Sequence, residues 1–572
     1  MTVHNTDIAN IFTKLADLLE IEGANPFRVR AYRRAAEVIV DLPKSATDML
    51  RAGEDFEELP GIGEDLAGKI REIIKTGRLK ALEEVEARTP STLASLTTIP
   101  GLGPKRVHAL HEKLGVATLA GLARAAGAHK IRRLRGFSEK IETKIEEELK
   151  KLRSAERRMR ISTAGELAAP LLSHMAAIPG IGEAVIAGSY RRCKETIGDL
   201  DILATGTKPK DVINRFVAYE DVASVVEKGT TRATVVLRSG VQVDLRVVPK
   251  ESFGSALHYF TGSKAHNIAI RKLGQARGLK INEYGVFRGA KRIAGRNEQD
   301  IFAAVGLPYI APELREDRGE IEAAQAGKLP KLLTLEEVRG DLHVHTAASD
   351  GKNDLREMVQ AAAGRGYRYL AITDHSKHAT VAHGLDERRL SKQLDEIDRL
   401  NDELDGICIL KSAEVDILAD GSLDLPDRIL RRLDLTVGAV HYKFDLDEKR
   451  QTERILKAMD NRYFTILAHP SGRLLGERQS YPVELGRVMS GAKERGCFVE
   501  LNAHPARLDL DDVHCKMAKE MDLLVSIATD AHSTMGLDMM RYGVGQARRG
   551  WLEAKDVLNT RPLAALKRLF RR

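Results

Sequence analysis

The feature that most constrains the fold is a set of short apolar runs after residue 339, each ending in a histidine or an acidic residue. Examples are AITDH, SAEVD, VGAVH, ILAHP and ATDAH, and charged helical segments separate them. Strands that alternate with helices predict a parallel sheet or barrel. Catalytic side chains of (β/α) barrels lie at the carboxyl ends of the strands, where the loops meet. We therefore expect one polar cluster, made of His343, His345, His375, Glu414, His441, His469, Asp530 and His532.

This set of residue types predicts a metal centre. His343 and His345 are two residues apart, so on an extended segment they face the same way. Imidazole and carboxylate together suit Zn²⁺, Mn²⁺ or Fe better than Ca²⁺. A bridging carboxylate such as Glu414 would hold two metals roughly 3.5–4 Å apart, as in enzymes that hydrolyse phosphate esters. A single histidine of this kind is more often a core residue, but several at strand ends favour a metal site. His504 and Arg507 could hold a substrate phosphate, although a surface role is the favoured interpretation.

Residues 339–572 resemble the polymerase and histidinol phosphatase (PHP) superfamily. The eight residues above match metal-site positions of that family, and the resemblance adds Asp350 as a ninth, at a position where histidine is common. The resemblance implies a distorted (β/α)₇ barrel that binds two to three ions, Mn²⁺ or Zn²⁺, and hydrolyses phosphoesters.

A second acidic cluster is expected in the segment AGSYRRCKETIGDLDIL, residues 187–203. Asp199 and Asp201 are two residues apart on a strand and share a face. A hairpin with its turn at Ser239-Gly240 would bring Asp244 beside them. Three such carboxylates can hold two Mg²⁺ or Mn²⁺ ions for in-line displacement at phosphate. Residues 151–315 carry a net charge of +10, against +1 before and −3 after, which suits a polyanionic partner. The residues expected to bind a triphosphate are Gly188, Ser189 and Arg192.

This constellation is similar to the nucleotidyltransferase superfamily, and more closely to the family X DNA polymerases. The stretch HYFTGSKAHNIAIRKLGQARGLKINEYGVF (258–287) resembles the thumb of that family. The resemblance implies an α+β palm and thumb. It also assigns Tyr259, Phe260 and Gly262 to the nucleotide sugar, Asn267 to the minor-groove edge of the base and Arg271 to the template.

The first 150 residues are predicted to be helical and to bind DNA. LPGIGEDLAGKI (59–70) and IPGLGPKRVHAL (99–110) are repeats in which glycines open a helix. Such a turn lets a phosphate approach the helix N-terminus, and its carbonyls can bind a monovalent cation. The repeats look like helix-hairpin-helix motifs, which hold DNA without reading its sequence; the alternative for either is a bare capping turn. LRGFSEKIETKI (134–145) is a weaker copy, and IPGIG (178–182) is discounted because it enters a strand. The expected DNA contacts are Gly61, Gly63, Lys69, Gly101, Gly103 and Lys105.

Lys69 also matches the lysine that forms a Schiff base with an abasic sugar in some family X members, where it supports 5′-deoxyribose phosphate lyase activity. Tyr32 and Arg28 lie in a matching helix, but Glu64 and Asp65 stand where lyase members are more basic. A phosphate contact or a surface charge is the alternative role for Lys69.

The predicted order is of the bacterial and archaeal type of family X polymerase. Its parts are a first helix-hairpin-helix domain (1–85), a second (86–150), palm (151–250), thumb (251–315), linker (316–338) and PHP domain (339–572). We expect a DNA repair enzyme that fills short gaps and a PHP domain that acts as a 3′→5′ exonuclease or cleans 3′-ends. The expected partners are gapped or nicked DNA and deoxynucleoside triphosphates, bound by a monomer.

No apolar run of membrane-spanning length is present, and four scattered cysteines suit a reducing compartment, so a cytoplasmic protein is expected. Three alternatives remain open. The PHP domain could be a phosphatase for a small phosphate ester, the chain could be a non-catalytic DNA-binding scaffold, or its core could be a template-independent nucleotidyltransferase.

Overall fold

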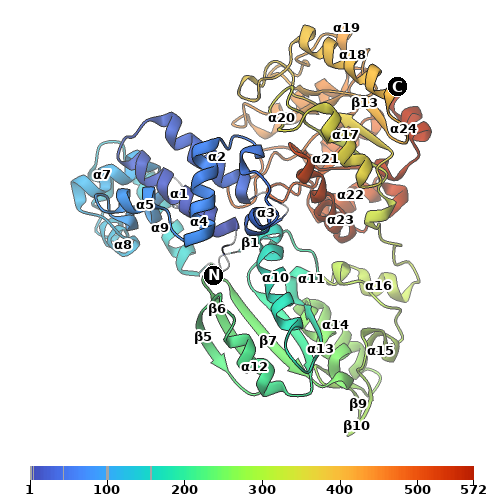
Figure 1. The fold of residues 1–572 in the computed structure, drawn as a ribbon. Helices are drawn as coiled ribbons and strands as arrows, with labels where there is room; N and C mark the ends of the chain where they lie inside the picture. Colours follow the sequence, from blue (N-terminus) through green and yellow to red (C-terminus); the bar gives the residue numbers. More distant parts are fainter. Residues whose placement is uncertain are drawn as a thin grey trace. The chain divides into compact units, whose positions relative to one another are not determined.

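A computed structural model describes residues 3, 5–40, 42, 44–97, 99, 102–154 and 158–571. The chain divides into two compact units, Met1–Arg158 and Met159–Arg572 (Figure 1). The division falls after Arg158, slightly beyond the boundary expected at residue 150. Among the described residues, no helix has both the length and the apolar character needed to cross a membrane.

The first unit is helical, as its apolar spacing predicts. In α1 the side chains of Ile8, Phe12, Leu15 and Leu19 are buried. Their spacing of three and four residues forms one stripe, and this stripe packs against α2. The helices are α1 Asn5–Ile21, α2 Pro26–Val40, α3 Ala46–Arg51, α4 Glu64–Thr76, α5 Lys80–Glu86, α6 Ala94–Thr97, α7 Pro104–Leu114, α8 Leu119–Gly127 and α9 Glu139–Ser154.

The second unit begins with an α+β region built on a five-stranded sheet. Its strand order is β2-β4-β7-β6-β5, with β4 and β7 parallel. The predicted hairpin is confirmed: β6 and β7 pair antiparallel, and Gly240 at the turn has a φ of +85°. The elements are β1 Met159–Arg160, α10 Ile161–Ala176, β2 Ile181–Ile186, α11 Gly188–Arg191, β3 Thr196–Ile197, β4 Leu200–Gly206, α12 Pro209–Val217, β5 Val222–Lys228, β6 Arg232–Leu237 and β7 Gln242–Val248.

Helices α10 and α12 bury apolar side chains against this sheet, in the core that also contains Leu200, Ile202 and Leu245 (Figure 1). A smaller cluster joins Leu203 to Phe253 of the following helix. That region contains α13 Phe253–Thr261, α14 Lys264–Gln275, β8 Lys280–Asn282, β9 Gly285–Arg288, β10 Lys291–Ala294 and α15 Glu298–Ala304.

The segment expected to be a linker, 316–338, is packed on both of its neighbours. It contains α16 Glu320–Gln325, and Glu320 pairs with His266 of α14 at 2.7 Å with both side chains fully buried. Farther along, the amide of Leu333 donates to the carbonyl of Leu552 in the C-terminal region. The charged, Ala-rich composition therefore reflects a helix whose Glu320 makes a buried contact with His266.

Residues 340–571 form a parallel barrel with helices outside (Figure 1). Strands β11-β12-β13 and β14-β15-β16-β17-β18 are parallel runs, and bridges from Val344 to Ala531 and from His375 to Glu414 join them into a closed ring. If β13 and β14 are taken as one interrupted strand, this fully described region has seven strands. The strands are β11 Gly340–Val344, β12 Tyr369–Ile372, β13 Cys408–Lys411, β14 Glu414–Asp416, β15 Val437–Ala439, β16 Ile466–Leu467, β17 Phe498–Asn502 and β18 Val525–Ala528.

The two ends of the barrel differ in chemistry. Leu566 and Phe570 of the last helix pack with Tyr369 and Phe498, which begin strands β12 and β17, so the amino end is apolar. The carboxyl end is left for the polar residues. The helices are α17 Leu355–Gly364, α18 Glu387–Glu403, α19 Asp427–Leu430, α20 Glu448–Met459, α21 Leu485–Glu494, α22 Asp512–Glu520, α23 Met540–Arg549 and α24 Leu563–Phe570.

Candidate functional site

The nine predicted barrel residues meet at the carboxyl end of the strands. His343 lies in β11, while His375, His441 and His469 follow β12, β15 and β16. Because parallel strands all end on one rim, residues nearly 190 positions apart can share a site. Every member of the set has a polar atom within 4.0 Å of another member. The structure thus brings the whole predicted set together.

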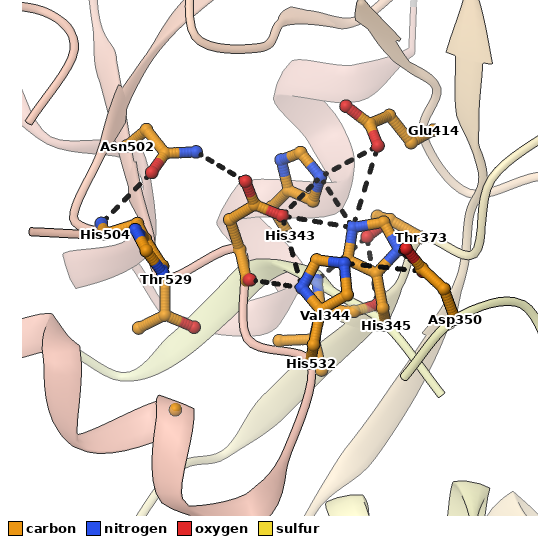
Figure 2. A network of polar contacts seen from close by, with 12 residues as sticks. His343, Val344, His345, Asp350, Thr373, Glu414, Asn502, His504, Thr529 and His532 are labelled. Carbon is orange, nitrogen blue, oxygen red and sulfur yellow. Dashed lines mark hydrogen bonds and ion pairs between the residues drawn. The ribbon is translucent and has the colours of Figure 1, made fainter. Parts of the chain in front are cut away.

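Glu414 is the centre of this cluster. One of its oxygens, Oε1, lies 3.2 Å from Nε2 of His441 and 3.0 Å from Nε2 of His469. The other, Oε2, lies 2.9 Å from Nδ1 of His375 and 3.5 Å from Nε2 of His343. Figure 2 shows Glu414 directed at the rings of His343 and His345. A carboxylate with imidazoles at both oxygens has the arrangement of a bridging ligand.

Two acidic residues complete the cluster. Asp350 lies 3.3 Å from His532 and 3.6 Å from His375, and Asp530 lies 3.2 Å from His345. Ligand atoms within 4.8 Å of one another fall into three groups: His345, Asp350, His375 and His532; His343, His345 and Asp530; His375, Glu414 and His441. Overlapping groups of this kind suit neighbouring ions that share ligands.

The electrostatics of the cluster fit divalent cations. Burial raises the pKa of a carboxyl group, yet positive charge on His441, His375 and His343 holds the pKa of Glu414 well below its ordinary value. Burial lowers the pKa of His343, but Glu500, Glu414 and Asp530 raise it well above its ordinary value. A divalent cation would supply this positive charge in place of the protons. Within the described residues, Nδ1 of His345 and Oε2 of Glu414 are buried and make no hydrogen bond of good geometry, although Oε2 lies at ion-pair distance from His375; atoms that bind a metal are left in this way.

Three buried acidic residues around the cluster were missed from the sequence. Glu500 accepts from Nδ1 of His343 at 2.6 Å, Asp416 accepts from Nδ1 of His441 at 2.9 Å, and Asp341 accepts from the hydroxyl of Thr529. Carboxylates bonded to a ring nitrogen, as Glu500 and Asp416 are, fix the tautomer and ring orientation of metal-binding histidines. Asp341 instead accepts from the backbone amide of His343 at 3.3 Å. Two of them were detectable, because Asp341 and Asp416 lie two residues from His343 and Glu414 and so share their strand face.

Arg507 does not have the surface role that the sequence favoured. Its side chain is largely buried, and Nε lies 3.5 Å from Oδ2 of Asp530. Burial lowers the pKa of His469, and the charge of Arg507 lowers it further. Arg507 therefore places a positive charge beside the cluster. His504 is half-buried, and its backbone amide donates to Asn502 (Figure 2).

The second acidic cluster lies on the central sheet. Asp201 of β4 and Asp244 of β7 are direct neighbours in the parallel ladder, and Asp199 immediately precedes β4. Burial raises the pKa of Asp201 to about 7, and repulsion from Asp199 and Asp244 adds to this rise. These carboxylates are not among the tight groups of described residues whose ligand atoms lie within 4.8 Å. Their mutual repulsion nevertheless favours binding of cations between them.

Neighbouring residues hold these aspartates in place. The Thr234 hydroxyl donates to Asp244, and Nε2 of Gln242 donates to Oδ2 of Asp244 at 2.7 Å. Gly188 has a φ of +60°, and a Cβ there would lie 2.2 Å from Oδ2 of Asp201. Only glycine fits this position, because any side chain would displace the carboxylate. Ser189 follows Gly188 in α11.

The predicted nucleotide-binding residues lie near this cluster. Nε of Arg192 pairs with Glu316 at 3.0 Å, and Nη1 donates to the carbonyl of Thr261. A Cβ at Gly262 would lie 3.1 Å from Nη1 of Arg192, so the guanidinium contacts the turn after α13. The Tyr259 and Phe260 rings meet edge to face, 5.1 Å apart.

Asn267 and Arg271 differ in their access to DNA. Asn267 is buried on α14, and its Nδ2 donates to the carbonyl of Tyr259 at 2.7 Å. To contact a base, the Asn267 amide would have to give up its hydrogen bond to Tyr259. Arg271 is exposed, and its Nε donates to the carbonyl of Asn267 at 3.3 Å.

In the N-terminal unit, glycines begin two helices as predicted. Gly63 caps α4 and Gly103 caps α7, each without a side-chain cap and with open space where a Cβ would project. The open space lets a phosphate approach the backbone amides. The first turn of α7 carries exposed Lys105, whereas that of α4 is acidic, so α7 offers the more favourable charge. Gly61 has a φ of +71° in the turn before α4, and Gly101 lies outside the described residues.

Lys69 lies on α4 with its ammonium group paired to Asp65. The ammonium nitrogen is 5.9 Å from the centre of the Tyr32 ring, and Arg28 lies at the same distance from that ring. Lys69 is thus grouped with the two residues that the family resemblance pairs with it, but Asp65 engages its charge.

Comparison with known families matches four regions of the chain. A helix-hairpin-helix domain matches residues 3–79, and a SAM-like helix-hairpin-helix tandem matches 93–151. The DNA polymerase beta thumb matches 256–316, and the PHP domain matches 341–504. These regions follow the order predicted from the sequence.

Whole-chain comparisons agree with this order. The chain is 37% identical over its full length, and the full length of the relative, to a DNA polymerase/3′-5′ exonuclease of Bacillus subtilis. It is 26% identical to DNA polymerase lambda of Arabidopsis thaliana, covering 54% of this chain and 62% of that protein. It is 28% identical to a probable phosphatase of a Thermoanaerobacter species, covering 38% of this chain and 89% of that protein. The chain therefore belongs to the family X DNA polymerases that have helix-hairpin-helix domains, a thumb and a C-terminal PHP domain.

Proposed function

We propose that this chain is a DNA polymerase that fills short gaps and that its barrel is a 3′→5′ exonuclease, or more broadly a phosphoesterase that cleans 3′-ends. The observation that carries the proposal is the presence of two separate polar clusters in a chain that aligns from end to end with a DNA polymerase/3′-5′ exonuclease. One cluster is acidic and lies on β4 and β7, and the other is rich in histidine and lies on the barrel rim.

In the acidic cluster, Asp199, Asp201 and Asp244 would hold two Mg²⁺ or Mn²⁺ ions. When bound, such ions activate the primer 3′-hydroxyl and stabilise the charge of the leaving pyrophosphate. Thr234 and Gln242 keep Asp244 oriented toward the cluster. Gly188, Ser189 and Arg192 would bind the triphosphate of a deoxynucleotide. The remaining contacts would come from Tyr259, Phe260 and Gly262 to the sugar, Asn267 to the base and Arg271 to the template.

In the barrel, the nine clustered residues would hold two to three Mn²⁺ or Zn²⁺ ions. Glu500 and Asp416 would orient the rings of His343 and His441, and Asp341 accepts from the hydroxyl of Thr529 and the backbone amide of His343. Arg507 would hold the phosphate of the terminal nucleotide; its position 3.5 Å from Asp530 supports this role. His343 and His441 each hydrogen-bond one of these carboxylates through Nδ1, which leaves Nε2 directed into the cluster.

The helix-hairpin-helix turns would bind the DNA backbone on either side of a gap. Gly61, Gly63, Gly103 and Lys105 would contact phosphates, and the turns would accept a monovalent cation. We further propose that the protein acts as a monomer.

Lys69 would contact a 5′-phosphate. A further hypothesis is that Lys69 also acts as a 5′-deoxyribose phosphate lyase, which DNA with an abasic end would test.

A separation-of-function experiment tests the central proposal. Gapped DNA with a labelled primer is incubated with deoxynucleotides and Mg²⁺ or Mn²⁺, and extension and nucleotide release are followed. Asp244→Asn should abolish extension and leave release unchanged, whereas Glu414→Gln should do the reverse. Asp211→Asn, at an exposed position of α12, is the control that should change neither. Loss of both activities in one of the two site variants would contradict the two-site arrangement.

A second function for the barrel is supported by its likeness to a probable phosphatase over 89% of that protein. The barrel would then act on a small phosphate monoester. Comparing the turnover rate of a single-stranded oligonucleotide with that of histidinol phosphate distinguishes the exonuclease from the phosphatase. Faster turnover of the small ester would favour the phosphatase.

A further inference from the structure

The barrel holds the loop that carries Arg192. Leu508 of the barrel lies within the apolar core of the central sheet, and Leu475 and Tyr542 pack against the same core. Arg473 pairs with Glu195 at 2.7 Å, and a Cβ at Gly545 would lie 3.3 Å from Sγ of Cys193. The loop between α11 and β3 is therefore fixed by barrel side chains as well as by its own sheet.

Arg549, at the end of α23, makes the most direct connection. Its Nη1 donates to the backbone carbonyl of Arg192 at 2.8 Å and to Oε1 of Glu316 at 3.0 Å. Its Nη2 donates to Asp512 at 2.6 Å. The side chain is only 2% exposed, so these hydrogen bonds are made away from water, where they are strong.

Glu316 links the two arginines. Its Oε1 accepts from Nε of Arg192 and from Nη1 of Arg549, each at 3.0 Å. Burial raises the pKa of Glu316, but Arg192, Arg549 and Lys194 together lower it, so the carboxylate stays charged. One carboxylate oxygen is thus divided between an arginine of the barrel and an arginine of the nucleotide site.

The position of Arg192 makes this division relevant to the polymerase site. Arg192 contacts the turn at Thr261 and Gly262, and its charge opposes the rise in the pKa of Asp201. Without Arg549, Glu316 would have Arg192 as its main counter-charge and would hold that guanidinium more tightly. The backbone of Arg192 would also lose the hydrogen bond that anchors it.

We propose that Arg549 of the barrel is a positioning residue for nucleotide addition: it takes part of the Glu316 charge and anchors the Arg192 backbone, which keeps the Arg192 guanidinium available to a triphosphate. This proposal rests on the proposed polymerase function. The barrel then serves nucleotide binding in the other site as well as its own hydrolysis. The two activities share one folded unit because a barrel side chain completes the polymerase site.

The test is steady-state single-nucleotide insertion into gapped DNA by the full chain, with KM and kcat measured separately. Arg549→Ala should raise KM for the deoxynucleotide about fivefold or more, within the range of coupled sites, and change kcat less. Adding Glu316→Gln to Arg549→Ala should bring KM back toward the original value, because the charge that binds the Arg192 guanidinium too tightly is then removed. Arg549→Lys, which keeps the charge but not the three hydrogen bonds, should have an intermediate KM.

Arg548→Ala is the matched control. Arg548 lies on the same helix, pairs with Glu313 at 2.7 Å and donates to the carbonyl of Leu333 at 2.9 Å, instead of to Arg192 or Glu316. Its KM should stay near that of the original chain. Equal KM values for Arg549→Ala and Arg548→Ala, or no recovery in the double variant, would overturn the proposal. If Arg549→Ala fails to fold, the KM of Arg549→Lys decides. Failure of the unsubstituted chain to extend a primer would instead overturn the proposed polymerase function.

Discussion

Replacing Gly188 with alanine should impair nucleotide addition through a single misplaced carboxylate. The added methyl group would lie 2.2 Å from Oδ2 of Asp201 and 3.2 Å from its Cγ. Because Cβ atoms essentially never approach another heavy atom closer than 3.0 Å, Asp201 must turn or retreat by about 1 Å. A displacement of this size can cost roughly 100-fold in rate. That loss corresponds to a rise of about 2.7 kcal/mol in the activation barrier.

A second cost of this substitution must be separated from the first. The φ of Gly188 is +60°, and a left-handed conformation costs a residue with a Cβ roughly 1–2 kcal/mol of stability. Gly240→Ala is the matched control, because Gly240 has a φ of +85° and open space where its Cβ would project. Both variants carry backbone strain, in a helix and in a turn that adjoin the same sheet, but only Gly188→Ala disturbs Asp201.

The assay is single-turnover insertion of one nucleotide into gapped DNA, with nucleotide release by the barrel measured on the same preparations. Gly188→Ala should lose extension by about two orders of magnitude while release stays unchanged. Gly240→Ala should retain both activities. Extension rates that agree within a few fold between the two variants would show that Asp201 has no critical position, and the reasoning about this site would fail.

Three further predictions concern other parts of the second unit. Arg507→Ala should slow nucleotide release from an oligonucleotide by roughly 10-fold or more, which is the effect of losing a charge-assisted hydrogen bond. Arg462→Ala, at an exposed position, should not slow release. Equal release rates for the two variants would mean that Arg507 has only a surface role. Dialysis against a chelator should abolish both activities and lower the melting temperature, and Mn²⁺ should restore them; an unchanged melting curve and full activity would exclude a metal role. Glu298→Gln should lower the free energy of unfolding by about 3 kcal/mol, because it breaks a buried pair with Arg191 and Arg315. Burial raises the pKa of Glu298, but these arginines lower it from 4.5 to about 2, so its stabilisation is complete above pH 4.5 and is lost as the pH falls toward 2. Acid titration of both proteins checks this, and parallel curves would refute it.

Much of each site was readable from local patterns. The spacing of His343 and His345, or of Asp199 and Asp201, indicates that the two side chains share a strand face, because successive side chains of a strand point to opposite faces. The same rule applies to Asp341 and Asp416, which lie two residues from His343 and Glu414 on the same strands. Glu500 lies within an apolar strand, and its buried charge was itself a signal of a partner.

Other features could not be deduced from local patterns. The segment 316–338 has the composition of a linker, yet Glu320 is buried against His266. Arg507 has the sequence context of a surface loop, yet it lies beside Asp530. In both cases the partner is supplied by another part of the chain, and composition contains no information about that partner.

The sequence by itself determined the two sets of candidate site residues, the order of the regions and the family, because residue type and short-range periodicity indicate the chemistry of a side chain and the face on which it lies. Only the tertiary structure decided which residues of distant regions touch. The fold places Glu414 between imidazoles that follow several strands, and it places Arg549 against Glu316 and Arg192. It also brings Asp201 so close to residue 188 that only glycine fits there. These contacts depend on how separate elements pack, and packing is a property of the whole folded chain that no short segment carries.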